Sequence, residues 1–548
     1  MGLFGLLGDV VHQNKKACII IGCWVMVEIL LIAPPYRSAV TMRIGFLIMM
    51  ITGAVILNRY FWVRIFRPLL QLAGAPPTKR GTGECCCCCL CRKHDGRQVR
   101  ALRACFVLLY VVIYGVTLSA LILEQRVSTT NGKDPHPWVY FSFQWAGAFV
   151  LLLVSAWFVD MFIMLIRVVH FLRRRLFQGT GNGNGKLALP LWVFPLLWLV
   201  TFVVFVSVSS VHGERDPVIR RIEVPLASLP TCLDGYSLAM ISDIHAGPTV
   251  GRDEIARHAE AINALGADAI IMVGDLVDDQ VEDIGSIVEP VSRFSAPDGQ
   301  FFAMGNHEEY TGQAQEWADF VADRGFTFSC CSTQDTKVTL PPGADEVEGC
   351  YFYLAGVNDF ESDPDYEAAL SGRNASIATV LLAHQPIQAR ERKVSEASKY
   401  SVGLMLSGHT HGGQVFPYHV LAYLDQGYVS GLHKKDETFL YVSEGAVGWG
   451  PRMRLLSTTE YTHIILRSPE LFLEADTSIT EPTRAAGAAG VLLLMTFVYC
   501  LGYPIVRAFR RAKESRNTVD SMRDTDGELV SVEEAAVRRR VVVRDHGS

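Results

Sequence analysis

The stretch "AMISDIHAGP" at residues 239–248 decides how the C-terminal half of the chain folds. Apolar residues run into Asp243, and His245 lies two positions later. Side chains two positions apart on an extended chain point to the same side, so a strand that ends here presents a carboxylate and an imidazole together. Asp243 alone could be a helix N-cap. The role of the pair therefore depends on the residues at the ends of the other strands.

Strand-like apolar runs alternate with helical patterns across residues 212–482. The predicted strands cover 236–242, 268–273, 299–304, 351–356, 376–383 and 401–407. The predicted helices cover 252–266, 283–294 and 312–325, and Pro290 breaks the second of them. Strands that alternate with helices are typical of a layered α/β domain.

Five of the predicted strands are each followed by a short polar cluster. Together these clusters contain Asp243, His245, Asp275, Asn306, His307, His384, His409 and His411. Loops at the strand ends of an α/β sheet converge, so we expect the clusters to form one site. Imidazole, carboxylate and amide oxygen suit divalent Mn, Fe, Zn or Mg.

Without His307 the set still holds seven donors, too many for one tetrahedral ion. Two divalent metal ions that share a carboxylate fit better. Paired ions of this kind clamp the attacking and leaving oxygens in phosphoryl transfer.

The same residues carry a family resemblance. The ordered blocks D-x-H (243–245), GD (274–275), GNHE (305–308), His384 and GHTH (408–411) resemble the calcineurin-like metallophosphoesterases. The strings "ISDIHAGPTVGR", "VGDLVDD", "SGHTHGGQVFP" and "GWGPRMRLL" look most like the membrane-associated branch of that family. The similarity spans residues 230–466, under half of the chain. It implies a four-layer α/β/β/α sandwich.

The resemblance also implies roles, position by position. One ion would be held by Asp243, His245 and His411, and the other by Asn306, His384 and His409, with Asp275 as the bridge. A metal-bound hydroxide would attack phosphorus. His307 would protonate the leaving oxygen as general acid, and Arg454 could face the phosphate.

Other polar residues nearby have ordinary interpretations. The Asp278-Asp279 pair is expected to be a solvated turn, and Glu308 and Glu309 to support their loop or face solvent. The remaining histidines of the domain are expected to be surface or core residues: His212, His258, His419, His433 and His463.

Long apolar runs predict membrane spans, since a span needs roughly 20 apolar residues. The candidates are 17–33, 42–58, 104–123, 138–166, 189–211 and 485–506. Asp160 in the fourth run either faces a bundle interior as a functional group or lies near a helix end or against a neighbouring helix.

The distribution of Lys and Arg predicts the orientation. The segments 59–103, 167–186 and the tail after 506 are rich in both, whereas the loops 34–41 and 124–137 carry three between them. The basic segments are therefore expected in the cytoplasm and the domain outside it or in a lumen.

These assignments predict the organisation of the chain. It is a multi-pass α-helical membrane region of five spans (1–211), the metallophosphoesterase domain (212–482), a sixth transmembrane helix (483–506) and a disordered cytoplasmic tail (507–548).

Cysteine placement fits this topology. The run "ECCCCCLCRK" at 84–93 lies in a basic loop next to a span, where acylation is the favoured interpretation and a metal cluster is the alternative. The domain holds Cys232, Cys330, Cys331 and Cys350, which could form disulfides or remain buried thiols. Asn374 opens a glycosylation sequon.

We therefore expect a membrane-anchored hydrolase that cleaves a phosphate or pyrophosphate ester with two metal ions. The short tether after the fifth span favours a lipid-linked or membrane-proximal substrate beside the lipid bilayer. The alternative is a membrane receptor or transporter whose ectodomain retains the fold. A net charge of -6 gives no sign of nucleic-acid binding.

Overall fold

The computed structural model describes residues 137–177, 190, 192–328, 336–339, 350–390 and 402–471. They belong to two compact units, one with residues 158–177 and Pro190, the other with 137–157 and all described residues from 192 onward. The α/β domain lies wholly in the second unit. Outside the described residues lie the expected spans 17–33, 42–58, 104–123 and 485–506, the run 84–93 and the tail.

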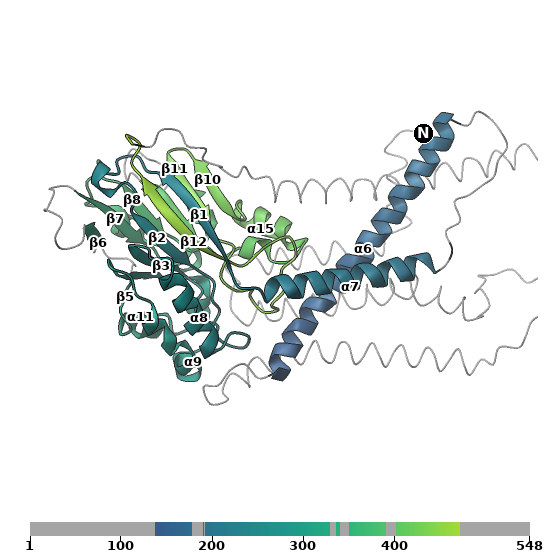
Figure 1. The fold of residues 1–548 in the computed structure, drawn as a ribbon, viewed down its shortest axis with the longest axis horizontal. Coiled ribbons are helices and arrows are strands. Elements are labelled where there is room, and N and C mark those ends of the chain that lie inside the picture. Colours follow the sequence, from purple (N-terminus) through teal and green to yellow (C-terminus); the bar gives the residue numbers. More distant parts are fainter. Residues whose placement is uncertain are drawn as a thin grey trace, which may run out of the picture. The chain divides into compact units, whose positions relative to one another are not determined.

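Two helices in the described part are long and apolar enough to cross a membrane (Figure 1). They are α6 (Pro137–Phe177), which qualifies over Pro137–His170, and α7 (Val193–Gly213). They coincide with the expected spans 138–166 and 189–211. Asp160 is buried in the middle of α6. With two such helices described, the six-span arrangement stays a prediction.

The domain is built on two mixed six-stranded sheets. The first has, in order, β1 (Val218–Pro225), β12 (Glu460–Arg467), β2 (Ser237–Ile241), β3 (Ala269–Val273), β4 (Gln300–Ala303) and β5 (Phe326–Phe328). The second has β10 (Gly431–Lys435), β11 (Thr438–Val442), β9 (Val402–Ser407), β8 (Thr379–Leu382), β7 (Tyr351–Gly356) and β6 (Thr336–Thr339). Strands β2 to β5 are parallel, and so are β11, β9, β8 and β7.

Helices connect the strands, and three of them correspond to the predicted helices 252–266, 283–294 and 312–325. They are α8 (Arg252–Asn263), α9 (Val281–Val288), α10 (Asn306–Tyr310), α11 (Ala314–Ala322), α12 (Tyr366–Leu370) and α15 (Tyr418–Gln426). Short 3-10 turns are η3 (Thr231–Leu233), η4 (Glu289–Arg293), η5 (Phe360–Ser362), η6 (Pro386–Arg390) and η7 (His411–Gly413). The predicted helix 283–294 stops at Val288 and continues as η4, because Pro290 cannot donate a helical hydrogen bond.

Three apolar clusters give the layers (Figure 1). One joins the outer face of the first sheet to α8, α9 and α11; Ile241 and Ile255 both belong to it. The second lies between the sheets and includes Met240 and Leu404. The third joins the second sheet to α12 through Leu381 and Leu370. The order is helix, sheet, sheet, helix, so the predicted α/β sandwich is confirmed.

The structure also settles one pair of cysteines. A disulfide joins Cys232 in η3 to Cys350, which directly precedes β7. Of the two interpretations left open for these residues, the disulfide is the one observed.

Candidate metal centre

All of the predicted donors follow the carboxyl ends of parallel strands. The first sheet contributes the loops after β2, β3 and β4, and the second sheet the loops after β8 and β9. Several donors have a left-handed backbone: φ is 56° at Asp243, 50° at His245, 53° at Asp275, 70° at His409 and 49° at His411. Such residues cost of order 1–3 kcal/mol each and cluster at functional sites.

Two glycines let these loops approach each other. A Cβ added at Gly408 would lie 2.4 Å from Oδ2 of Asp243, and one at Gly305 would lie 2.2 Å from Oδ1 of Asp275. Neither distance leaves room for a methyl group. The two aspartates therefore lie directly against the backbone of neighbouring loops.

The first donor group is Asp243, His245 and His411, whose ligand atoms lie within 4.8 Å of one another. Nδ1 of His245 lies 2.7 Å from a carboxylate oxygen of Asp278, and Nδ1 of His411 lies 3.0 Å from the carbonyl oxygen of Val447. If each Nδ1 carries the proton, both Nε2 atoms present lone pairs. These two Nε2 atoms face each other at 3.1 Å.

Two facing lone pairs repel unless a cation lies beside both. Oδ2 of Asp243 is buried and has no hydrogen-bond partner among the described residues. A divalent ion satisfies all three groups at once, so this part of the site fits a metal.

The second group is Asp275, His384 and His409, joined by Asn306. Nδ1 of His384 bonds to the carbonyl oxygen of Val273 at 2.9 Å, which leaves its Nε2 facing Oδ2 of Asp275 at 3.0 Å. Nδ1 of His409 lies 2.8 Å from Oδ1 of Asn306. A lone pair beside a carboxylate again calls for a proton or a cation between them.

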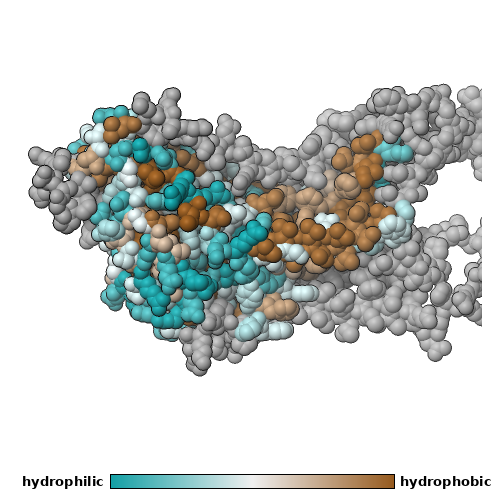
Figure 2. All heavy atoms as spheres, in the orientation of Figure 1, coloured by the Kyte–Doolittle hydropathy of each residue, from teal (hydrophilic) through white to brown (hydrophobic). Residues whose placement is uncertain are grey.

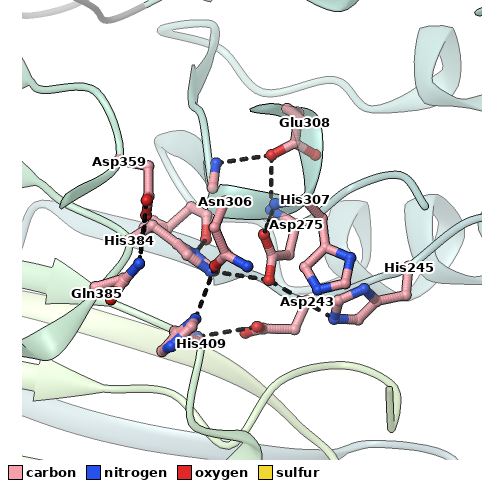
Figure 3. Close-up of polar contacts among 12 residues, drawn as sticks. Asp243, His245, Asp275, Asn306, His307, Glu308, Asp359, His384, Gln385 and His409 are labelled. Atoms are coloured by element: carbon pink, nitrogen blue, oxygen red, sulfur yellow. Dashed lines mark hydrogen bonds and ion pairs between the residues drawn. The ribbon is translucent and has the colours of Figure 1, made fainter. Parts of the chain in front are cut away.

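Asp275 lies between the two groups (Figure 3). Its Oδ2 is 3.0 Å from Nε2 of His384 and 3.8 Å from Nε2 of His245, and its Oδ1 accepts from the backbone N–H of His307 at 3.0 Å. The carboxylate is placed to contact ions in both groups.

Burial and neighbouring charges tune these donors. Burial lowers the pKa of His409 to about 3 and the pKa of His411 well below its usual value, so both rings are neutral at pH 7. Burial also raises the pKa of Asp243. Although burial alone would raise the pKa of Asp275, the charges of His384 and His307 hold it well below its usual value. In the protein without metal, Asp275 raises the pKa of His384 to about 10 against the effect of burial.

Asp278 is part of the site, so the prediction of a solvated turn at this residue is wrong. One carboxylate oxygen lies 2.7 Å from Nδ1 of His245 and 2.7 Å from Nδ1 of His307. Burial opposes protonation of His307, yet Asp275 and Asp278 raise its pKa to about 9. The sequence offered one signal for this role, a carboxylate three positions after Asp275 in the same strand-end loop.

Glu308 supports its loop, as predicted. It is buried and accepts backbone N–H groups of Gly305 at 2.7 Å, Asp275 at 3.0 Å and Leu276 at 2.7 Å. Burial and the charge of Asp275 raise its pKa to about 7.

Arg454 does not face a phosphate, contrary to the expectation from the sequence. It is fully buried, and its guanidinium donates to the carbonyl oxygens of His411 and Val447. These hydrogen bonds hold the loop that carries His411 in place.

Three other histidines of the domain are not members of the donor groups. His258, His419 and His433 are buried beside the hydroxyl of Tyr461 and the carbonyl oxygens of Leu456 and Ser430, respectively. Their prediction as ordinary core residues is confirmed.

Known proteins are similar in sequence to this chain. The calcineurin-like phosphoesterase family model matches residues 236–413. A transmembrane protein with metallophosphoesterase domain from Danio rerio is 29% identical over 438 residues, 78% of this chain and 90% of that protein. The protein of the same description from Bos taurus is 30% identical over 376 residues, 67% of this chain and 82% of that protein. An uncharacterized metallophosphoesterase of Helicobacter pylori is 36% identical over 256 residues, 46% of this chain and 65% of that protein.

Proposed function

The chain belongs to the calcineurin-like metallophosphoesterases and is a metal-dependent phosphoric ester hydrolase, and we propose that it cleaves its ester at a centre of two divalent metal ions. The observation that carries this proposal is the pair of Nε2 atoms of His245 and His411, which face each other at 3.1 Å. A buried carboxylate oxygen of Asp243 completes that group.

We assign the first ion to Asp243, His245 and His411 and the second to Asn306, His384 and His409. Asp275 is the shared ligand, because its carboxylate lies between the two groups. When bound, two divalent ions activate water at neutral pH and neutralise the charge of a phosphoryl group.

His307 is the proposed general acid. Asp278 fixes its Nδ1 at 2.7 Å, so Nε2 is the atom that can hand a proton to the leaving oxygen. The backbone N–H of His307 is bonded to Asp275, which keeps the ring beside the proposed centre. General acid catalysis typically contributes about 10²–10⁴-fold in rate.

Metal depletion and reloading test this function. The full chain in detergent is stripped with a chelator and reloaded separately with Mn, Zn, Fe or Mg. It is then assayed with p-nitrophenyl phosphate, bis(p-nitrophenyl) phosphate and inorganic pyrophosphate. We expect activity only after reloading. If the reloaded protein binds metal and cleaves neither ester nor a pyrophosphate, the receptor or transporter hypothesis replaces the enzyme.

We further propose that the domain lies outside the cytoplasm or in a lumen. The Cys232–Cys350 disulfide supports this, since disulfides persist in oxidising compartments. Asn374 of the sequon is exposed, which makes glycosylation sterically possible. In sealed right-side-out vesicles, added protease should digest the domain of a surface protein, whereas the domain of a protein from an internal compartment should be protected. A tag within 81–97 that is accessible from the same face as the domain contradicts this topology.

A further inference from the structure

The outward face of α15 is apolar. Leu424 is 70% exposed, Leu421 58% and Tyr418 57%, whereas His419 and Gln426 on the inward side are buried. A surface helix in water normally shows the opposite arrangement, with its apolar face toward the core. An apolar partner would bury the three exposed side chains of this face.

This helix is tied closely to the candidate metal centre. A Cβ added at Gly413, in η7 beside His411, would lie 2.5 Å from the Cα of His419. The ring Nε2 of His419 lies 3.2 Å from the carbonyl oxygen of Leu456, a residue that is itself 64% exposed. The apolar face of α15 and Leu456 are thus held together next to the loop that carries His411.

The residues just before Leu456 contact both apolar helices within the same compact unit. The backbone N–H of Arg454 donates to the carbonyl oxygen of Ser209 in the last turns of α7 at 2.8 Å. Gly147 of α6 leaves room for Pro451, since an added Cβ would lie 2.7 Å from that ring. The segment 449–456 therefore connects α15 to α6 and α7.

Charged residues lie next to the C-terminal end of α7. Arg452 is paired with Glu254 at 2.6 Å and lies 3.7 Å from Glu214, which directly follows α7. Such charges belong at the aqueous side of a membrane boundary. The surface of α7 itself is largely hydrophobic (Figure 2), with Val211 still 51% exposed in its last turn. The apolar surface of α7 thus extends to its last turn, near the point where Arg454 bonds to Ser209.

Trp449 lies between this region and His307, the proposed general acid. Its side chain is 51% exposed, and its ring centroid lies 5.7 Å from that of His307. Tryptophan and tyrosine are enriched at membrane–water interfaces. Trp449 and Tyr418 thus match the residue types of an interfacial belt.

We propose that the face formed by Tyr418, Leu421, Leu424 and Leu456 rests in the lipid leaflet beside the metal centre, and that the ester hydrolysed there belongs to a lipid headgroup. The second clause rests on the proposed hydrolase function. The bilayer is the occupant because the segment 449–456 ties this face to Ser209 of α7 and Gly147 of α6, the two helices that are long and apolar enough to cross a membrane.

Photocrosslinking tests the contact without any assay of activity. The full chain carries p-benzoylphenylalanine in place of Leu424 and is placed in phosphatidylcholine nanodiscs. The control carries it in place of Leu471, which is 53% exposed. β1 follows α7 and runs away from it for eight residues, which corresponds to about 26 Å along the strand. β12 is parallel to β1, and Leu471 comes after its last residue, so Leu471 lies at the end of the sheet farther from α7.

We expect lipid adducts from position 424 and none from position 471. A protein adduct at 424 overturns the proposal. So does the absence of any adduct at 424 under conditions in which the same residue placed on the exposed surface of α7 crosslinks to lipid. Equal lipid adducts at both positions also overturn it.

A second experiment tests the substrate class. The full chain in nanodiscs is assayed with phosphatidic acid, phosphatidylglycerol and a polyprenyl pyrophosphate, and in parallel with the two soluble nitrophenyl esters. In Leu421→Gln/Leu424→Gln, the ratio of lipid to soluble turnover should fall roughly tenfold, equivalent to about 1.4 kcal/mol, as two leucines lose apolar burial. Leu471→Gln should leave the ratio unchanged.

The outcomes separate the two levels of inference. Cleavage of soluble esters but of no membrane lipid, or an unchanged ratio in the double variant, overturns the lipid proposal and leaves the hydrolase intact. Cleavage of neither class of ester overturns the proposed function instead.

Discussion

Replacing Asp278 with asparagine tests how much the residues that hydrogen-bond to the proposed metal ligands and general acid contribute to activity. One oxygen of Asp278 lies 2.7 Å from Nδ1 of both His245 and His307. Asparagine keeps the size but removes the charge that both rings use. Replacing a hydrogen-bond partner of a metal-ligating histidine typically costs about 10–100-fold in metal affinity or activity. We expect kcat to fall by about that factor, which corresponds to about 1.4–2.7 kcal/mol.

The pH profile of this variant should shift in a defined direction. Burial lowers the pKa of His307, and Asp275 and Asp278 raise it to about 9. The protonated ring is the donor, so the rate is full below this pKa and is lost as pH rises through it. Without the charge of Asp278 the pKa falls, and the alkaline limb moves to lower pH. Bound metal ions lower both values, which leaves the direction of the difference unchanged.

The assay compares kcat for p-nitrophenyl and alkyl esters from neutral to alkaline pH in both forms. Asp279→Asn is the matched control, because the Asp279 side chain accepts from the backbone N–H of its neighbour Gln280. The control should behave as the wild type. The reasoning is refuted if Asp278→Asn has the kcat of the wild type and loses activity at the same alkaline pH.

Three further changes test other parts of the site. Asp275→Asn should lose most activity and at least one bound ion, which metal analysis measures; two ions with normal turnover contradict its bridging role. His307→Ala should keep both ions and lose far more kcat with alkyl than with nitrophenyl esters, because nitrophenolate needs little protonation; equal losses contradict the acid role. Gly408→Ala should lower the free energy of unfolding by about 1–3 kcal/mol, since the added Cβ would lie 2.4 Å from Asp243. The control is Gly403→Ala, where the atom nearest to the added Cβ is 3.4 Å away. Equal thermal midpoints in the two variants argue against the close approach at Gly408.

The sequence was most informative where strands are buried on both faces. β2 and β3 are continuous apolar runs between two packed layers, so their positions and the donors that follow them could be predicted. Asp243 and Asp275 are recognisable for the same reason, because each follows such a strand by two residues.

Contacts that are distant in sequence could not be predicted. The sequence of β1 is rich in charged residues. Its Arg220 pairs with the buried Glu460 of β12 and with the buried Glu444, which lie 240 and 224 residues later in the chain. Asp278 looks like part of a solvated turn until α10, which carries His307, is placed beside it. The cysteine spacing likewise left the pairing of Cys232 with Cys350 open, since 118 residues separate them.

The outward face of α15 was missed for a different reason. Helical spacing shows that Leu421 and Leu424 share a face, but whether that face is inside or outside depends on how η7 and the segment 449–456 pack. The spacing of the residues in the sequence shows which side chains share a face of the helix, but only the packing of the helix shows whether that face is buried or exposed.

The central claim is that two metal ions share Asp275, and electron paramagnetic resonance of the Mn-loaded full chain tests it most directly. Two ions about 3.5–4 Å apart should give the spectrum of a coupled pair, with two Mn per chain by metal analysis. A single Mn per chain in fully active protein, or two Mn with the spectrum of isolated ions, would contradict the account.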